Sequence, residues 1–217
     1  MSRWFAVSAS REIPRGHIAH TQLLGQELAV WRSASGELNA WENRCPHRGV
    51  RLTIGSCVGE ELRCQYHAWR FASGSGQCTY IPAHPTQKPA ATIRARAFPV
   101  REDGTFAWVN LAPEAAAAPP PDPGIARALR SMFVQAPVAE LRAVLLGGYG
   151  QGSVTATDEY TLLGEPDLEF MLQPVSDRQA IVHARLRGHR EGAERLAELR
   201  HHNALLSAVR DRAEAAA

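Results

Sequence analysis

The sequence predicts an α+β protein that is mainly β, in which an antiparallel sandwich or barrel is followed by a small antiparallel sheet with a long C-terminal helix. Short runs of alternating apolar and polar residues, separated by turn sequences, occupy residues 1–111. Alanine and proline replace that pattern over residues 112–124. Beyond this break, residues 125–217 hold further strand-like runs and then a helical pattern.

The first region, residues 1–111, contains six runs with the period of a half-buried strand. Sequences such as SASGE, SGSG and EDGT punctuate them and favour tight turns between neighbouring strands. We therefore expect a domain of short antiparallel hairpins. Its strands are predicted at residues 4–8, 27–33, 37–42, 61–64, 93–100 and 105–110.

The second region begins after a run of three prolines, which favours an extended connector over residues 112–124. Residues 131–136, 140–146, 168–174 and 180–187 are predicted as strands. Residues 191–217 then place apolar side chains on one stripe of a long helix. The stripe consists of Leu196, Leu199, Leu206, Val209 and Ala213.

Composition and charge exclude several classes of protein. With 217 residues, of which 45% are hydrophobic, the chain is long enough to bury a substantial core. A net charge of +2 is too small to indicate a nucleic-acid-binding protein. No apolar run is long enough to span a membrane and no secretory signal is evident, so a cytoplasmic location is expected. Residues 1–111 carry 13 basic and 8 acidic side chains, whereas residues 112–217 carry 11 basic and 14 acidic ones, so the two regions have opposite net charge.

Two cysteines and two histidines form the most informative motif. Cys45 and His47 form the pattern C-x-H, and sixteen intervening residues separate it from Cys64 and His67, which form the pattern C-x-x-H. Thiolates and imidazoles are ligands for both zinc and iron. The single residue between Cys45 and His47 fits a zinc site poorly. It fits a two-iron cluster better, in which one iron binds two cysteines and the other two histidines.

The sequences CPHRG and CQYHAWRF resemble the cluster loops of Rieske proteins, in particular the N-terminal domain of Rieske non-haem iron oxygenases of the vanillate O-demethylase and dicamba monooxygenase type. The resemblance extends over about residues 3–111, including EIPRG and DGTFAWVNL. It implies a Rieske [2Fe-2S] cluster held by Cys45, His47, Cys64 and His67. The alternatives are a single zinc ion or four unlinked residues.

Three positions depart from related Rieske proteins. Respiratory and photosynthetic members resemble one another in a disulfide between the loops, whereas Val50 and Tyr66 occupy the matching positions here. They also tend to carry a serine where this chain has Trp69, so we expect fewer hydrogen bonds to the cluster and a low reduction potential. Ala68 replaces the family's usual glycine, and it is tolerated if its φ is not positive.

The remaining residues around the motif have structural interpretations. Trp69 and Phe71 are expected to pack beneath the second loop. Cys57 and Cys78 are expected to be buried apolar side chains, neither ligands nor a disulfide. The histidines in polar or proline-rich segments are predicted at the surface, namely His17, His20 and His84.

Full-length members of the resembled family carry a helix-grip domain whose mononuclear iron binds two histidines and a carboxylate. No histidine lies between His84 and His183, so that motif is missing, and residues 125–217 resemble a truncated helix-grip domain. We expect no mononuclear iron and, on the alternation of its strand, a solvent-facing or partner-facing His183. A hidden iron site would have to use His183, His189, His201 or His202, with Glu198 and Asp211 nearby, although adjacent histidines on a helix diverge by about 100°.

Two functions follow from the resemblance. In the first, the chain is an electron-transfer subunit without catalytic residues of its own. It accepts electrons from a flavin or iron-sulfur reductase and passes them to the mononuclear iron of a partner catalytic subunit in a hetero-oligomeric ring. In the second, it is a self-contained Rieske hydroxylase or demethylase with an unorthodox iron site. Two other interpretations are a free ferredoxin and an oxygenase from which the middle was deleted. Neither nucleic acid nor membrane is an expected partner.

Overall fold

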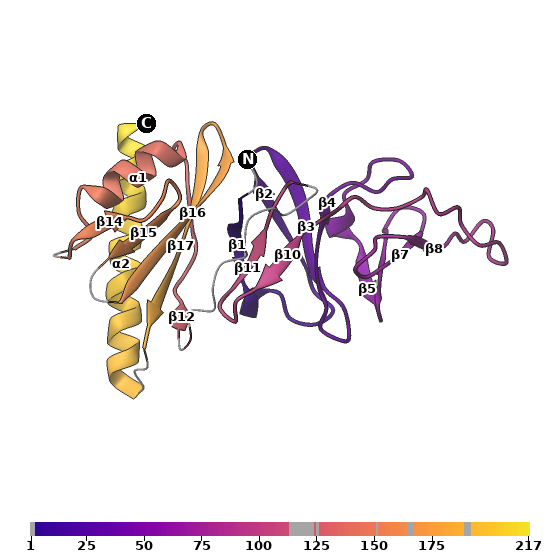
Figure 1. Ribbon diagram of the computed structural model, residues 1–217, viewed down its shortest axis with the longest axis horizontal. Helices are drawn as coiled ribbons and strands as arrows, with labels where there is room; N and C mark the ends of the chain where they lie inside the picture. The colour runs from indigo at the N-terminus through magenta and orange to yellow at the C-terminus, as the bar shows by residue number, and fades with distance from the viewer. Residues whose placement is uncertain (1–2, 113–123, 125, 151, 165–166, 189–191) are drawn as a thin grey trace.

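The computed structural model describes residues 3–112, 124, 126–150, 152–164, 167–188 and 192–217. The molecule is elongated, with antiparallel sheets along its length and the C-terminal helix at one end (Figure 1). This arrangement confirms the predicted mainly β fold. The predicted connector at residues 112–124 lies almost wholly outside the described residues, so the three-part division stays a prediction.

The first half contains three antiparallel sheets, ordered β1-β11-β10, β2-β3-β4-β9 and β5-β6-β7-β8. Short 3-10 helices at Ser10–Glu12 and Leu52–Ile54 lie between strands. The strands are β1 (Phe5–Ala9), β2 (Ile18–Leu23), β3 (Gln26–Arg32), β4 (Leu38–Glu42), β5 (Ser56–Val58), β6 (Glu61–Arg63), β7 (Arg70–Ala72), β8 (Cys78–Tyr80), β9 (Ala97–Phe98), β10 (Val100–Glu102) and β11 (Phe106–Val109).

Strand β3 shows why these sheets stack in three layers. Its side chains alternate between the two faces of the sheet, and both faces are buried. Leu28 and Val30 belong to the core shared with β1 and β11, whereas Ala29 and Trp31 belong to the core beneath the sheet β5–β8. The central sheet therefore joins a sandwich on one side to the motif-bearing hairpins on the other.

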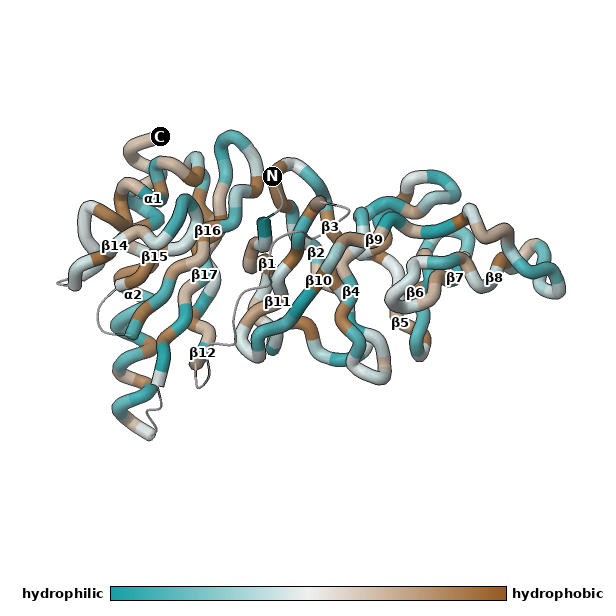
Figure 2. The backbone as a smooth tube through the Cα atoms, in the orientation of Figure 1, coloured by the Kyte–Doolittle hydropathy of each residue, from teal (hydrophilic) through white to brown (hydrophobic). Residues whose placement is uncertain are grey.

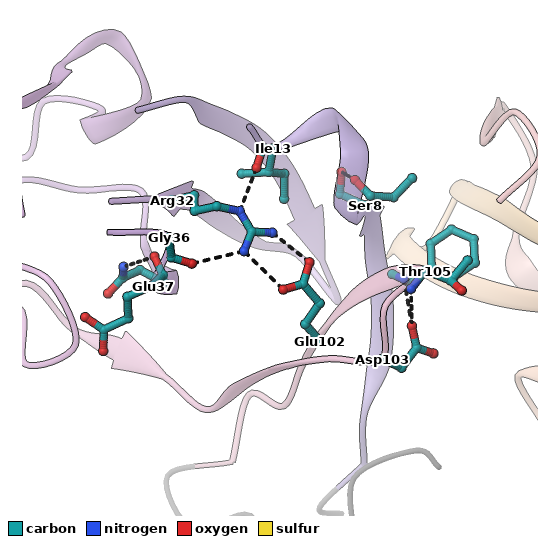
Figure 3. Close-up of polar contacts among 11 residues, drawn as sticks. Ser8, Ile13, Arg32, Gly36, Glu37, Glu102, Asp103 and Thr105 are labelled. Atoms are coloured by element: carbon teal, nitrogen blue, oxygen red, sulfur yellow. Dashed lines mark hydrogen bonds and ion pairs between the residues drawn. The ribbon is translucent and has the colours of Figure 1, made fainter. Parts of the chain in front are cut away.

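Arg32 fastens the turn after β3 to the neighbouring sheet (Figure 3). Its guanidinium donates to the carbonyl oxygens of Ile13 and Gly36 at 2.8 and 3.1 Å. It also forms a bidentate pair with Glu102, with N···O distances of 2.7 and 3.0 Å, and this pair lowers the pKa of the Glu102 carboxyl. A largely buried guanidinium thus satisfies the polar groups of three separate segments.

The second half is one antiparallel sheet with two helices on one face. Strand β17 pairs with β16 along one edge and with both β12 and β13 along the other. The elements are β12 (Ala126–Ala128), β13 (Met132–Val134), α1 (Val138–Leu146), β14 (Val154–Ala156), β15 (Thr161–Gly164), β16 (Leu168–Ser176), β17 (Gln179–Arg187) and α2 (Gly192–Ala216).

Residues 140–146, predicted as a strand, belong instead to helix α1. The run ELRAVLL is short enough to satisfy both periods, because Leu141 and Leu145 also stand one helical turn apart. Both leucines are fully buried against the sheet, and Pro137 precedes the helix at its N-terminal cap. The tertiary core therefore selects the helical period that the sequence left ambiguous.

Helix α2 confirms the predicted C-terminal helix but buries only part of its apolar stripe. Hydrophobic and hydrophilic bands alternate along the lower part of the helix (Figure 2). Leu206, Val209 and Ala213 are fully buried, whereas Leu196 is 49% exposed. The N-terminal end of α2 extends beyond the sheet at the bottom of the view (Figure 1), so the N-terminal part of the stripe has no sheet to pack against. No helix within the described ranges is both long and apolar enough to cross a membrane.

The two halves share a buried interface. The amides of Leu24 and Gly25, in the turn between β2 and β3, donate to the carbonyl oxygens of Pro174 and Val175 at 2.7 and 2.8 Å. A small apolar cluster between β1, β11 and β16 includes Trp108 and Met171, among other residues. The side of the second sheet away from its helices is thus covered by the first half.

Candidate metal centre

Cys45 and Cys64 begin two turns that have the same backbone geometry. In the first, the amide of Gly49 donates to Cys45 O at 2.8 Å, and the Cys45 amide donates to Val50 O at 2.8 Å. In the second, the amide of Ala68 donates to Cys64 O at 3.1 Å, and the Cys64 amide donates to Trp69 O at 2.9 Å. In each turn, the two hydrogen bonds thus join the cysteine to the residues four and five positions later. The spacings C-x-H and C-x-x-H place the histidine at different positions of one common scaffold.

A left-handed residue completes each turn at the same point. Gly49 has φ 72° and Ala68 has φ 56°. A glycine enters this region freely, whereas a side chain with a Cβ atom is strained there by about 1–2 kcal/mol. The expectation that Ala68 would avoid positive φ is therefore wrong. The hydrogen bonds that close the turn impose this conformation on the residue.

The two thiols lie together on the inner side of the site. Cys45 and Cys64 are only 4% and 2% exposed. Burial is the largest effect on the Cys45 thiol and raises its pKa to about 11, and the neighbouring Cys64 thiol also raises the pKa of Cys45. The backbone amides of His47 and Arg48 act in the opposite direction to burial and lower the pKa of the Cys45 thiol.

The two imidazoles lie together on the outer side. The ring centroids of His47 and His67 are 4.7 Å apart, and His67 is exposed while His47 is half-buried. Trp69 stacks on His47 at 4.1 Å with an interplanar angle of 6°, and Tyr66 contacts His67 at 3.8 Å. Desolvation, followed by the neighbouring charge of His67, lowers the pKa of His47. This shift favours the neutral imidazole that a metal requires.

Apolar side chains and the buried Asn43 support the two turns from beneath. Phe71 is fully buried beneath them, as predicted, and Trp69 is only partly buried because its ring lies against His47. Asn43 is also fully buried. Its side-chain Oδ1 accepts a hydrogen bond from the Thr53 backbone amide at 2.9 Å, and its backbone amide donates to Glu27 O at 3.0 Å. Asn43 therefore pins both ends of the first turn to the central sheet.

The donor set fits a cluster of two metal ions better than a single ion. Two buried thiols form one pair and two outward imidazoles form the other, as a [2Fe-2S] cluster with one iron on each pair requires. Within the described ranges, no three or more His, Cys, Asp or Glu side chains are grouped to hold one ion. The fit thus rests on the division of the donors into a sulfur side and a nitrogen side.

The other cysteines and the surface histidines lie close to where they were expected. Cys57 and Cys78 are free thiols, Cys78 buried and Cys57 partly buried, and burial raises the pKa of the Cys57 thiol to about 11. His17, His20 and His84 are exposed.

His183 corrects a prediction, because it does not face solvent. It is 1% exposed, and burial lowers its pKa to about 3, so the ring is neutral. Its Nε2 donates to Gln173 Oε1 at 2.8 Å, because the amide nitrogen of Gln173 donates to the Gln22 carbonyl at 2.7 Å and to Thr21 at 2.8 Å. The Ser131 hydroxyl then donates to His183 Nδ1 at 2.8 Å.

The remaining histidines considered for a mononuclear iron are scattered. His201 is exposed on α2, and His202 is partly buried beside the hydroxyl of Tyr149, which lies 3.2 Å from its Nδ1. His189 lies outside the described residues. Together with the hydrogen-bonded His183, these positions do not converge on one point within the described part of the chain.

The paired turns and their donors define a domain of the Rieske iron-sulfur class within the first half of the chain. Residues 3–99 match the family model described as the Rieske [2Fe-2S] domain, and this half of the chain is a Rieske [2Fe-2S] domain. It is similar to the oxidoreductase NdmD of Pseudomonas putida, at 51% identity over 111 residues, which are 51% of this chain and 19% of that protein. It is also similar to the 4β-methylsterol monooxygenase of Methylococcus capsulatus, at 36% identity over 109 residues, or 49% of this chain and 29% of the relative.

The likeness to solved structures extends into the second half. A crystal structure of dicamba monooxygenase aligns with a TM-score of 0.78 at 19% identity, covering 98% of this chain and 85% of that one. At this identity the comparison shows the fold alone. The chain spans less than a third of the length of the two curated relatives.

Proposed function

We propose that this chain is the electron-transfer component of a Rieske oxygenase system. In this proposal the thiolates of Cys45 and Cys64 hold one iron of a [2Fe-2S] cluster, and the imidazoles of His47 and His67 hold the other. When bound, such a cluster accepts and releases one electron at a time. The observation that carries the proposal is the division of the donors, with paired thiols buried and paired imidazoles facing outward.

The residues around the cluster have distinct parts in this function. Burial of both cysteines beneath the turns keeps water from the sulfur side, and the nearby backbone amides of His47 and Arg48 favour the Cys45 thiolate by lowering its pKa. On the opposite side, the exposed His67 edge offers the shortest path for an electron to a docked protein. The inner side therefore holds the cluster, and the outer side exchanges electrons.

The proposed partners follow from the resemblance. A flavin or iron-sulfur reductase would supply electrons, and a catalytic subunit with a mononuclear iron would receive them, within a hetero-oligomeric ring. Similarity to NdmD and to a monooxygenase supports membership of such a system. Cys57 and Cys78, the two thiols outside the proposed ligand set, are not joined in a disulfide, which supports a reducing compartment such as the cytoplasm. The second half would then serve as an assembly platform, as a truncated helix-grip domain.

Iron and acid-labile sulfide on anaerobically purified protein test the proposal, together with an electron paramagnetic resonance spectrum after dithionite reduction. We expect two irons, two sulfides and a Rieske-type signal per chain. A third, non-cluster iron would favour the alternative, a self-contained oxygenase. One zinc without sulfide would refute both functions.

Substitution of single cysteines assigns the ligands. Cys64→Ala should abolish the visible spectrum of the cluster, because a thiolate bond to iron is lost. Cys57→Ala is the matched control and should retain it, since Cys57 is a partly buried thiol outside the two turns. An unchanged spectrum in the Cys64→Ala protein would show that the ligand assignment is wrong.

The reduction potential should lie in the lower part of the Rieske range, which runs from about −150 to +300 mV. Trp69 supplies a ring that stacks on His47 at the position where other members carry a serine hydroxyl. With one donor fewer to the cluster, its reduced form is less stabilised. A potentiometric titration that gave a value near the upper limit would contradict this reasoning.

A further inference from the structure

Positive charge is concentrated in the segment that carries the metal centre. Residues 43–101 contain nine arginines and lysines but only two acidic residues, Glu60 and Glu61. The rest of the chain contains 15 basic and 20 acidic residues. Sheet β5–β8, which belongs to this segment, lies at the end of the molecule farthest from α2 (Figure 1). A chain of nearly neutral net charge is thus strongly polarised along its length.

Neither of the two acidic residues neutralises the arginines of the first turn. Glu60 is occupied by Ser35, whose amide and hydroxyl donate to its carboxylate at 2.8 and 2.7 Å. Glu61 pairs with Arg70 at 3.6 Å. From residue 62 to residue 101 the sequence has no acidic residue at all. Outside this segment, Glu27 neutralises Arg51 through a bidentate pair.

Three arginines next to the turns keep their charge available. Arg44, Arg48 and Arg63 are exposed and none of them forms an ion pair with a described residue, although Arg44 lies near enough to Glu27 to help Arg51 lower the pKa of that carboxyl. Arg48 follows His47 directly in the chain, and Arg44 Nη1 lies 4.0 Å from the position of a Cβ atom on Gly49. Arg63 immediately precedes Cys64, and its Nε donates to Ser56 Oγ at 3.2 Å. These three residues are named the arginine collar.

Exposed apolar groups accompany the collar. Tyr66, in the second turn, is 61% exposed, and Ile54, at the end of the short helix after the first turn, is 57% exposed. An outward imidazole edge, large apolar side chains and uncompensated cations are features of a protein-binding surface. A phosphate backbone would use the cations but not the apolar groups, and it accepts no electron.

We infer that the cluster end docks on an acidic surface of a protein redox partner, with the arginine collar facing the carboxylates of that partner. The inference rests on the proposed electron-transfer function and specifies the partner's chemistry. Opposite charges on two protein surfaces steer the encounter and raise the association rate by about 10- to 1,000-fold at low ionic strength. The collar thus brings the exposed His67, with His47 beside it, against the partner's redox centre.

Small redox ions of opposite charge test the local field at the cluster. In stopped-flow experiments, the reduced cluster gives one electron to hexacyanoferrate(III), forming hexacyanoferrate(II), or to hexaammineruthenium(III), forming hexaammineruthenium(II). We expect the rate with the anion to fall as salt is added and the rate with the cation to rise. The double variant Arg44→Gln/Arg48→Gln should lower the rate of electron transfer to the anion about tenfold at low salt. Arg178→Gln/Arg200→Gln removes two exposed charges from the second half and should leave both rates unchanged.

A second measurement requires no electron transfer. Hexacyanochromate(III), a redox-inert paramagnetic anion, should broaden the Nε–H resonances of the collar arginines in ¹⁵N-labelled protein and spare Arg178 and Arg200. If Arg44→Gln/Arg48→Gln does not assemble the cluster, this experiment is carried out with Arg63→Gln, which should remove only the Arg63 resonance. Uniform broadening over the whole surface would overturn the inference.

Protein-sized probes identify the class of partner. An acidic plant-type ferredoxin should bind at low salt through the collar, and a basic cytochrome c should not. Tighter binding to a duplex DNA of about 20 base pairs, or to phosphatidylserine vesicles, would overturn the assignment to a protein partner. A protein without a dithionite-bleachable spectrum would instead refute the proposed function, and the chromium experiment would still report on the collar.

Discussion

At the scale of single residues, the metal centre shows how identical backbone turns carry unlike sequences. Gly49 and Ala68 occupy equivalent left-handed positions, each closing its turn onto the carbonyl of a cysteine. The identity of the four candidate ligands could be predicted from the motif, because their chemistry is carried by the residues themselves. The conformation of Ala68 could not, since it is imposed by hydrogen bonds within the folded turn.

Replacement of Ala68 by glycine should therefore stabilise the protein. Relief of the strain at φ 56° is expected to contribute about 1 kcal/mol, reduced in part by the greater freedom of glycine in the unfolded chain. Urea unfolding of the Ala68→Gly protein measures the difference. Ala72→Gly, at the end of β7, is the control and should be destabilising, because no left-handed conformation is relieved there.

His183 should make stability depend on pH. Its pKa is about 3 in the folded chain and about 6.5 when unfolded, so below about pH 6.5 the unfolded state binds a proton more readily. The stabilisation from the neutral ring is complete above about pH 6.5 and is lost as the pH falls toward about 3. The free energy of unfolding should thus fall by up to about 1.4 kcal/mol per pH unit through this group.

A comparison of variants isolates that effect. The pH dependence between about pH 7 and about pH 5 should be shallower in His183→Gln than in the parent protein, whatever the variant's absolute stability. His201→Gln removes an exposed histidine and should leave the slope unchanged. Equal slopes in all three proteins would mean that His183 is not buried as a neutral ring.

At the scale of elements, helix α2 shows the difference between the apolar stripe that a periodic pattern predicts and the part of that stripe that is buried in the core. Its apolar stripe predicts a helix over its whole length, and the helix is present. The stripe does not reveal how far the opposing sheet extends, and only residues that face the sheet are buried. The same limit explains α1, whose seven-residue pattern fitted a strand and a helix equally well.

Truncation of two leucines on α2 should therefore have unequal effects. Leu206→Ala is expected to cost about 2–5 kcal/mol, because it leaves a cavity in the core of the second half. Leu196→Ala should cost less than about 0.5 kcal/mol, since the side chain is 49% exposed. Chemical unfolding monitored by circular dichroism measures both, and a similar cost for each would show that the N-terminal part of α2 is covered.

At the scale of the whole molecule, buried polar groups join the two halves. Arg185, 2% exposed, binds Glu169 of β16 at 2.8 Å and also Asp103, which lies after β10 in the first half. Asp103 in turn accepts hydrogen bonds from the amides of Thr105 and Phe106 at 2.9 and 2.7 Å (Figure 3). The charges on one face of β17 are therefore compensated by the neighbouring half.

Removal of Arg185 should destabilise the chain strongly. Arg185→Leu leaves the carboxylate of Asp103 buried without its cation and leaves Glu169 with only the half-exposed Arg187, which costs about 3–5 kcal/mol. Arg210→Leu, which breaks the exposed pair with Asp211, should cost less than about 1 kcal/mol. Urea titrations of both variants provide the measurement, and a cost below about 1 kcal/mol for Arg185→Leu would mean that the halves separate in solution.

The sequence by itself predicted the chemistry proposed for the metal centre and determined the alternation of the strands, because a ligand's donor atom and the period of a strand are local properties. It indicated that His183 and Arg185 share one face of β17, opposite Val182 and Ala184. Only the tertiary structure decided what covers that face. Alternation separates the two sides of a sheet, but burial depends on contacts between residues far apart in the chain, such as Gln173 with Thr21. The polar face predicted to meet solvent or a partner is therefore the seam between the two halves.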